Sequence, residues 1–162
     1  SAAELQARSG AMVYCGVATA ALLAEGRSPR HMPRPVQFIL DHFVRYKAVD
    51  RAAIRPVTDG DALPVLGGLR VLAAPGHTLE QHAFYSPAAG VLFAADALNT
   101  RDGRLQTTPP RITADRAAAE RTAVQLLQLS PQVIACGHGA PLVDSRAATA
   151  DLLAQLLGQT RG

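Results

Sequence analysis

The chain has 162 residues, of which 48% are hydrophobic and 18% charged, and its formal net charge is +3. This length predicts one domain over residues 1–162, and the composition is typical of a globular protein. The 16 Lys and Arg residues are scattered and aromatic residues make up only 4% of the chain, so we expect no nucleic-acid partner. No apolar run reaches the roughly 18 residues of a membrane span, so we expect no membrane partner. The cysteines, Cys15 and Cys136, form no disulfide framework, which predicts a cytoplasmic protein.

The N-terminal third of the chain predicts two short helices around a strand. Residues 1–9 have the pattern of the tail of a helix that ends at Gly10, without a residue that caps its start. We therefore expect this chain to be the C-terminal portion of a longer domain that has lost its N-terminus, together with any targeting signal. A β-type run over residues 11–15 predicts a strand, and an alanine-rich run over residues 16–25 predicts a helix that ends at Gly26.

A Pro-rich loop is expected over residues 27–35, and a helix over residues 36–48. Apolar side chains recur at helical spacing in the second segment: Phe38, Ile39, Phe43 and Tyr46. His42 shares their face, and we interpret it as a helix-face or core histidine rather than a ligand. His31, which lies between prolines, is interpreted as solvated.

The middle of the chain predicts a β-meander and a hairpin. Strands are expected at residues 55–57, 62–65, 69–73, 82–85 and 91–95. Turns are expected between them at Asp59-Gly60-Asp61, Gly67-Gly68, Pro75-Gly76 and residues 86–90. The polar segment that follows, residues 99–110, is expected to be irregular.

The C-terminal third predicts helix, strand and helix. The first helix covers residues 112–129, capped by Thr113 or Asp115, and the strand covers residues 133–135. The last helix is capped by Asp144 or Ser145 and ends at Gly158. Its expected inward face is Leu152, Leu153, Leu156 and Leu157. The fold class is therefore α/β (α+β), with a mixed or antiparallel sheet and flanking helices.

Three polar residues lie just beyond the ends of predicted strands, where a rigid scaffold presents side chains. They are His77 and His138, each beside a glycine, and Asp96. Two imidazoles and one carboxylate suit Zn²⁺, and also Fe²⁺ or Mn²⁺. Such a metal would lower the pKa of bound water to about 7, so hydrolysis would need no Ser or Cys nucleophile. The sequence therefore predicts that His77, Asp96 and His138 form a metal site.

Other polar residues near this cluster are given structural roles. Cys136 shares a strand face with His138, and an inert thiol is favoured over a ligand. His82 is interpreted as sheet lining, and Thr78 as a residue that holds the His77 loop. Three further acidic residues are interpreted as loop or cap residues: Asp102, Asp115 and Asp144.

At these residues the sequence resembles the metallo-β-lactamase-fold hydrolases, especially their glyoxalase II-like branch. The resemblance runs from residue 1 to Pro141 and includes an initial helix tail and strand followed by the meander. Its more specific parts are Pro75-Gly76-His77-Thr78, residues 92–98 and Cys136-Gly137-His138-Gly139-Ala140-Pro141. The order of these pieces is more specific than any one of them.

The resemblance implies an αββα sandwich with a two-metal site at one edge, most often zinc. His77 would bind the first metal, Asp96 would bridge both metals and serve as the catalytic carboxylate, and His138 would bind the second. A hydroxide held between metals about 3.5–4 Å apart would attack an ester, thioester, lactam or phosphoester.

The sequence departs from the family pattern in three places. The His-x-His-x-Asp-His motif, which supplies more than half of the metal ligands, does not occur in it. Leu79-Glu80-Gln81 replaces the Pro-Gly that often follows Gly-His-Thr, and Ala94-Ala95 replaces the usual Thr-Gly or Ser-Gly before the aspartate. We therefore expect a truncated metal-dependent hydrolase with an incomplete metal site, possible loss of activity, and an uncovered sheet that favours homo-oligomers.

Two alternatives stand beside this hypothesis. One is a non-catalytic binding domain of the same fold, with vestigial ligands at His77, Asp96 and His138. The other is an unrelated α/β binding module that matches by chance. A small-molecule substrate is expected, with residues 27–46 as the element that sets specificity. Within that element, Arg34 or Arg45 would pair with an acidic substrate or simply form a solvated face.

Overall fold

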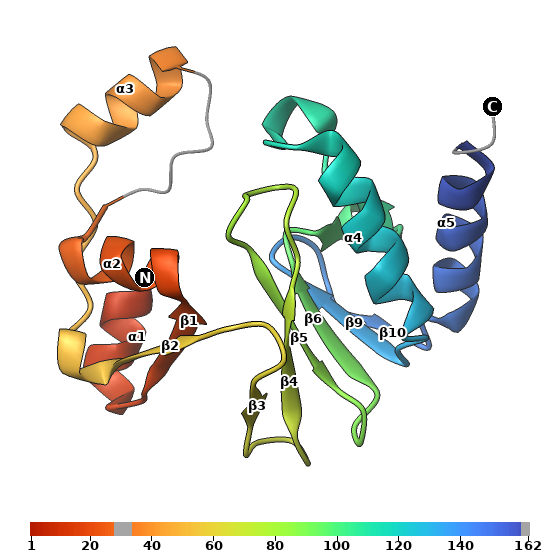
Figure 1. Cartoon of the computed structure of the whole chain (residues 1–162), viewed down its shortest axis with the longest axis horizontal. Coiled ribbons are helices and arrows are strands. Elements are labelled where there is room, and N and C mark those ends of the chain that lie inside the picture. The colour runs from red at the N-terminus through yellow and green to blue at the C-terminus, as the bar shows by residue number, and fades with distance from the viewer. Residues whose placement is uncertain (28–33, 160–162) are drawn as a thin grey trace. The chain divides into compact units, whose positions relative to one another are not determined.

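The computed structural model describes residues 1–27 and 34–159, so the predicted position of His31 lies outside the described residues. Contacts divide the chain into two compact units, Ser1–Thr58 and Asp59–Gly162, and each is described by itself. Figure 1 colours the first unit from red to yellow and the second from yellow to blue. A contact unit is not by itself an independently folding domain, so the single-domain assignment stays a prediction.

The first unit is a small parallel β-pair with helices. Its elements are α1 (Ala2–Ser9), β1 (Val13–Gly16), α2 (Val17–Glu25), α3 (Arg34–Phe43), η1 (Arg51–Ala53) and β2 (Ile54–Val57). β1 and β2 pair in parallel, with Val13 opposite Ile54. The unit has a small core in which Ala3, Val49 and Ile54 are buried.

Two expectations about the first unit are wrong. The start of α1 is capped, because the Ser1 hydroxyl accepts a hydrogen bond from the Glu4 N–H and Glu4 completes a capping box. The segment 54–57 is not the first strand of the meander, because it pairs with β1 and not with the strand that follows it. The nearby turn at Asp59-Gly60-Asp61 favoured a hairpin between residues 55–57 and 62–65. The actual partner, β1, lies about forty residues upstream and pairs in parallel, an arrangement that no local sequence pattern indicates.

The helix that was expected over residues 36–48 ends early, at Phe43. Beyond it the backbone turns to the end of α2. The Tyr46 N–H donates to the Gly26 carbonyl at 3.2 Å, and the Val49 N–H donates to the Leu23 carbonyl at 2.9 Å. The N–H groups of Tyr46 and Val49 thus bond to carbonyls at the end of α2 and not within α3. For this reason α3 is shorter than the spacing of its apolar residues predicts.

The second unit consists of one mixed sheet and a layer of two helices. The sheet has the order β10-β9-β6-β5-β4-β3. Its strands are β3 (Ala62–Leu63), β4 (Leu69–Ala73), β5 (His82–Ser86), β6 (Val91–Ala95), β9 (Val133–Cys136) and β10 (Leu142–Val143). Neighbours are antiparallel except for β6 and β9, which are parallel. The predicted strands at 69–73, 82–85 and 91–95, and the hairpin between the last two, are confirmed.

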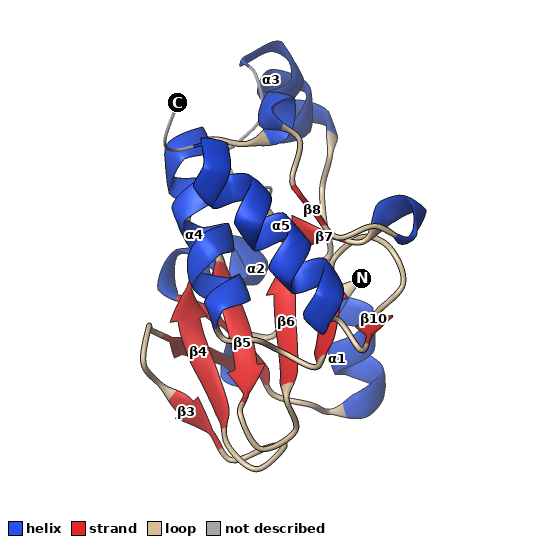
Figure 2. Ribbon diagram, turned by 90° about the vertical axis from the view of Figure 1, so that its right-hand side faces the viewer, coloured by secondary structure: helices blue, strands red, loops and turns tan. Residues whose placement is uncertain are grey.

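Helices α4 (Arg116–Gln128) and α5 (Arg146–Gln159) cover one face of this sheet, as Figure 2 shows. Leu92 and Ile134, on adjacent strands, are both fully buried in the core beneath them. The helices contribute apolar side chains to the same core: Leu126, Leu127, Leu152 and Leu156. Removing this much apolar surface from water is the main force that holds the layers together.

The C-terminal elements differ from the sequence predictions in detail. Asp115 caps α4 and accepts from the Ala118 N–H at 2.9 Å. α5 continues through Gly158, where a glycine stop was expected, and Leu157 is 45% exposed and not part of the inward face. The segment expected to be irregular contains a small hairpin, β7 (Leu98–Asn99) with β8 (Gln106–Thr107), and two short turns, η2 (Arg101–Gly103) and η3 (Pro110–Ile112).

Candidate metal centre

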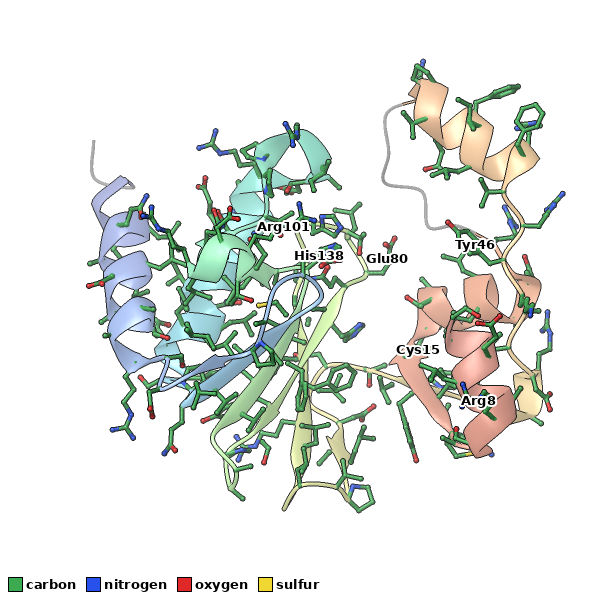
Figure 3. All side chains as sticks on the ribbon, turned by 180° about the vertical axis from the view of Figure 1, so that it is seen from behind. Arg8, Cys15, Tyr46, Glu80, Arg101 and His138 are labelled. Carbon is green, nitrogen blue, oxygen red and sulfur yellow. The ribbon has the colours of Figure 1, made fainter. Side chains whose placement is uncertain are left out.

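The three predicted ligands meet at one edge of the sheet in the second unit. Asp96 directly follows β6 and His138 lies two residues beyond β9, and these parallel neighbours end on the same side. His77 lies in the loop after β4, which runs in the same direction as β6 because β5 between them is antiparallel to both. Figure 3 labels His138 at this edge, together with Arg101 and Glu80 from neighbouring loops.

The two histidines face different oxygens of one carboxylate. His77 Nε2 lies 3.8 Å from Asp96 Oδ2, and His138 Nε2 lies 3.7 Å from Asp96 Oδ1. Both separations are too long for a hydrogen bond. The side chains are 12% exposed for His77, 34% for Asp96 and 57% for His138. The site therefore opens to solvent on the His138 side, and the predicted meeting of the three residues is confirmed.

The three side chains form two histidine–carboxylate pairs that share Asp96. Among the described residues, no group of three or more His, Cys, Asp or Glu side chains is arranged around one metal ion. Each histidine instead faces one oxygen of Asp96: His77 faces Oδ2, and His138 faces Oδ1. That these residues bind metal stays a prediction.

A cation would fit the environment of Asp96. Asp96 Oδ1 is buried and accepts no hydrogen bond from residues 1–27 and 34–159, a situation that costs free energy unless a partner neutralises the oxygen. Gly137 lies against the same oxygen, and a Cβ at this position would overlap it. The glycine beside His138 therefore leaves room for the carboxylate, and the imidazole and carboxylate donors suit a divalent cation.

The loop that carries His77 is bound to the N-terminal end of α4. Gly76 has φ 143°, and a Cβ there would overlap the backbone of Ala119. The Asp115 N–H donates to the Gly76 carbonyl at 3.0 Å, and the Ala114 N–H donates to the His77 carbonyl at 3.1 Å. The Thr78 carbonyl accepts from the Gly76 N–H at 3.0 Å, so Thr78 contributes to the loop as predicted, through its backbone.

Asp96 follows a distorted strand end. The β6–β9 register shifts between Phe93 and Ala95, and Ala95 has φ 48°, in the left-handed region. The Gly137 N–H donates to the Ala95 carbonyl at 2.9 Å. A non-glycine residue with positive φ is uncommon, and here it directs the chain so that the next side chain, Asp96, reaches the two histidines.

The structural roles predicted for the other residues are largely visible. Burial raises the pKa of the Cys136 thiol to about 11, assisted by the nearby Asp96 carboxylate and opposed by a hydrogen bond with Thr100. A thiol that stays protonated is a poor metal ligand. His82 lies on β5 opposite Ala73. His42 is an exposed helix-face residue whose ring stacks on Phe38 with centroids 4.1 Å apart.

Sequence reasoning did not find three threonines that bind the site loops: Thr100, Thr108 and Thr122. They belong to no recognised motif, and each bonds to a carbonyl at least 12 residues away in sequence. The sequence shows only that each has a hydroxyl group, and the fold is needed to see that these hydroxyls lie beside the site loops.

Within the described ranges, no helix has both the length and the apolarity that a bilayer crossing requires.

A mixed sheet with a helical layer and a histidine–carboxylate cluster at its edge defines the class: an α/β protein with a candidate metal centre. Residues 2–138 match the metallo-beta-lactamase superfamily. The chain belongs to that superfamily, so a chance match by an unrelated binding module is excluded.

Known relatives agree with this assignment. The chain is 38% identical, over 86 residues, to a hydroxyacylglutathione hydrolase from Rhodobacter capsulatus, covering 51% of this chain and 31% of that protein. The structure resembles an archaeal metallo-beta-lactamase superfamily protein from Sulfolobus tokodaii (TM-score 0.70, 18% identity, 95% of this chain and 61% of that one). It also resembles a protein solved in a di-iron-bound form (TM-score 0.61, 24% identity, 90% of this chain and 66% of that one). The glyoxalase II-like branch is thus supported, and the chain spans less than two thirds of each of these relatives.

Proposed function

We propose that this chain carries part of the catalytic centre of a metal-dependent hydrolase, with His77, Asp96 and His138 as metal ligands. The single observation that carries the proposal is the shared carboxylate: two Nε2 atoms lie 3.8 and 3.7 Å from opposite oxygens of Asp96. Membership of the superfamily and the hydroxyacylglutathione hydrolase relative support the hydrolytic class.

The residues have distinct roles in this proposal. Asp96 would be the catalytic carboxylate that both cations share, and its buried Oδ1, which has no hydrogen-bond donor among the described residues, would be available to a cation. His77 and His138 bind through Nε2, which requires that each ring is neutral and carries its proton on Nδ1. When bound, a divalent cation supplies Lewis acidity, which activates water at neutral pH and polarises the bond to be cleaved.

Zinc is the first choice of metal, and iron or manganese are the alternatives, because imidazole and carboxylate donors suit all three. One protein of similar fold was solved with two irons bound. We propose two cations per complete site. Since the described residues provide two donors at each position, we expect this chain alone to bind cations weakly.

The substrate class is an ester, a thioester or a lactam. A thioester has the best support, because the relative from Rhodobacter capsulatus is a hydroxyacylglutathione hydrolase. We also propose that the segment around α3, which carries the exposed Arg34, and the exposed Arg45 set specificity.

Metal binding and hydrolysis test the proposal separately. The chain is purified without chelators, its metal content is measured by mass spectrometry, and Co²⁺ binding is followed by absorption. Asp96→Asn should abolish binding, whereas His42→Gln, which changes an exposed helix residue, should leave it unchanged. Hydrolysis is then assayed with a hydroxyacylglutathione, a nitrophenyl ester and a chromogenic β-lactam. Equal Co²⁺ binding by wild-type protein and Asp96→Asn would refute the metal assignment.

A second candidate function is a non-catalytic domain of the same superfamily. The observation that favours it is that no three-donor group around one ion exists among the described residues. Cation binding without hydrolysis of any of the three substrates would support this alternative.

The cytoplasmic location and self-association are further proposals. Both cysteines are free in the structure, which agrees with a reducing compartment. Phe93, on the face of β6 opposite the buried Leu92, is 37% exposed, and an exposed apolar sheet face favours association with a second copy.

A further inference from the structure

Three threonine hydroxyls bind the loops that carry the three candidate ligands. All three ligands lie beyond strand ends, where the hydrogen bonds of the sheet no longer fix the backbone. Thr122 comes from α4, Thr108 directly follows β8, and Thr100 directly follows β7. Thr122 is 2% exposed and Thr100 is 4% exposed, so bulk water does not compete with the hydroxyls of these two residues for their hydrogen-bond partners.

Thr122 holds the His77 loop. Its hydroxyl donates to the Pro75 carbonyl at 2.7 Å. Pro75 has no N–H of its own, and the next residue, Gly76, adopts φ 143°. The hydrogen bond therefore fixes the backbone at the point where β4 turns towards His77.

Thr108 holds Asp96 itself, because its hydroxyl donates to the Asp96 main-chain carbonyl. The N–H of the same peptide unit, that of Ala97, closes a tight turn and donates to the Ala94 carbonyl at 3.1 Å. Together these two bonds fix the orientation of the peptide unit that directly follows the Asp96 side chain.

Thr100 holds the His138 loop with two groups. Its N–H donates to the His138 carbonyl at 3.1 Å, and its hydroxyl donates to the Ala140 carbonyl at 2.6 Å and lies 3.3 Å from the His138 carbonyl. Gly139 packs so closely that a Cβ would overlap the carbonyl and hydroxyl of Thr100. The His138 loop is thus bound to the segment that follows β7.

We propose that Thr100, Thr108 and Thr122 are the positioning residues of the candidate metal centre, one for each donor. The inference rests on the proposed function, in which His77, Asp96 and His138 bind cations. Each hydroxyl fixes a carbonyl within two residues of one donor, and it acts through the backbone without touching a cation or substrate. Outer partners that hydrogen-bond a ligand side chain directly typically affect metal affinity about 10- to 100-fold, and we expect an effect of this order when the partner fixes the ligand's loop.

Paired substitutions separate positioning from general stability. Thr→Val at each position keeps the shape but removes the donor, and Thr→Ser keeps the donor. The matched control is Thr149→Val on α5, because Thr149 is 4% exposed and its hydroxyl finds no hydrogen-bond partner in the described part of the chain. Co²⁺ affinity is measured by absorption, and thermal unfolding is measured without metal.

We expect each Thr→Val variant of the three to lose about 10- to 100-fold in Co²⁺ affinity, and each Thr→Ser variant to stay within about threefold of wild type. Thr149→Val should bind Co²⁺ as wild type does. Wild-type affinity in folded Thr→Val variants would overturn the proposal. So would a loss of affinity that simply follows the loss of thermal stability, in the control as well as in the three variants.

A metal-free measurement distinguishes this proposal from the proposed function. Amide hydrogen exchange in the apo chain should accelerate locally: at Gly76 in Thr122→Val, at Ala97 in Thr108→Val, and at Gly137 in Thr100→Val. If wild-type protein binds no Co²⁺, the metal function fails, and local acceleration still shows that the threonines fix these loops. Unchanged exchange in all three variants overturns the positioning role whether or not metal binds.

Discussion

Gly137 lies so close to Asp96 that any side chain at position 137 would overlap the carboxylate oxygen Oδ1. The same oxygen faces His138 Nε2 at 3.7 Å. The glycine before His138 thus leaves space for the Asp96 carboxylate in the position that it has here, and a larger residue would force the carboxylate to shift.

The first prediction is that Gly137→Ala displaces the Asp96 carboxylate. The substitution should destabilise the chain by about 1–3 kcal/mol, as overpacking typically does, and lower Co²⁺ affinity at least about 10-fold. Thermal unfolding and Co²⁺ titration measure the two effects. Gly158→Ala is the control, because no atom of the described residues outside its own stretch of helix lies within 4 Å of the added Cβ, and it should be neutral or stabilising by up to about 1 kcal/mol. Equal behaviour of the two variants would contradict the steric explanation.

The second prediction concerns Ala95, which has φ 48° where the family usually has glycine. The left-handed conformation costs an L-residue about 1–2 kcal/mol, and glycine adds about 0.5–1 kcal/mol of backbone entropy cost. Ala95→Gly should therefore stabilise the chain slightly, by up to about 1 kcal/mol, without loss of Co²⁺ affinity. Chemical denaturation measures this difference. Ala94→Gly, at the adjacent and fully buried position, should destabilise by about 1 kcal/mol or more.

The sequence predicted the local parts of the second unit well. The apolar run at 91–95 and the turn before it, at residues 86–90, predicted β6 and its hairpin with β5, because alternation and turn residues are short-range signals. The meeting of His77, Asp96 and His138 was predicted from their common position after strand ends. That the two histidines face opposite oxygens of Asp96 could not be predicted. This arrangement depends on the φ angle of Ala95 and on side-chain packing, which no residue pattern encodes.

The wrong predictions involve competition between distant segments. β2 pairs with β1 in parallel, although its neighbours in sequence suggested a hairpin. α3 ends at Phe43 because Tyr46 and Val49 bond to carbonyls near the end of α2. Thr122 resembles any helical threonine until the fold brings Pro75 beside it. These features depend on tertiary contacts, which override local propensity.

The third prediction concerns the pH dependence of the first unit. A hydrogen bond from Lys47, 3.0 Å away, and the Ser1 ammonium group lower the pKa of Glu4 from 4.5 to about 2. Because the folded-state pKa lies below the unfolded value, the stabilisation is complete above pH 4.5 and is lost as the pH falls towards 2. Thermal unfolding should therefore show a stability loss in this window that Glu4→Gln reduces. The Glu4 side chain is 54% exposed, so high salt should reduce the effect as well. A Glu4→Gln profile parallel to wild type between these pH values would exclude this ion pair as the cause.

The fourth prediction is that the chain self-associates through the sheet face opposite the helices. Strand register aligns Phe84, Phe93 and Ala135 in one row on that face, while the adjacent Leu92 is fully buried on the helix side. Burial of such a row against a second copy would remove apolar surface from water at about 25 cal/mol per Å². Sedimentation velocity should show dimers or larger species whose fraction rises with protein concentration.

Phe93→Ser should shift that equilibrium towards monomer, because it places a polar group in the centre of the row. Leu157→Ser is the matched control, since Leu157 is 45% exposed compared with 37% for Phe93 and lies on α5. The control should sediment as wild type does. A concentration-independent monomer for the wild-type chain would count against the association, and an equal shift in both variants would place the contact elsewhere.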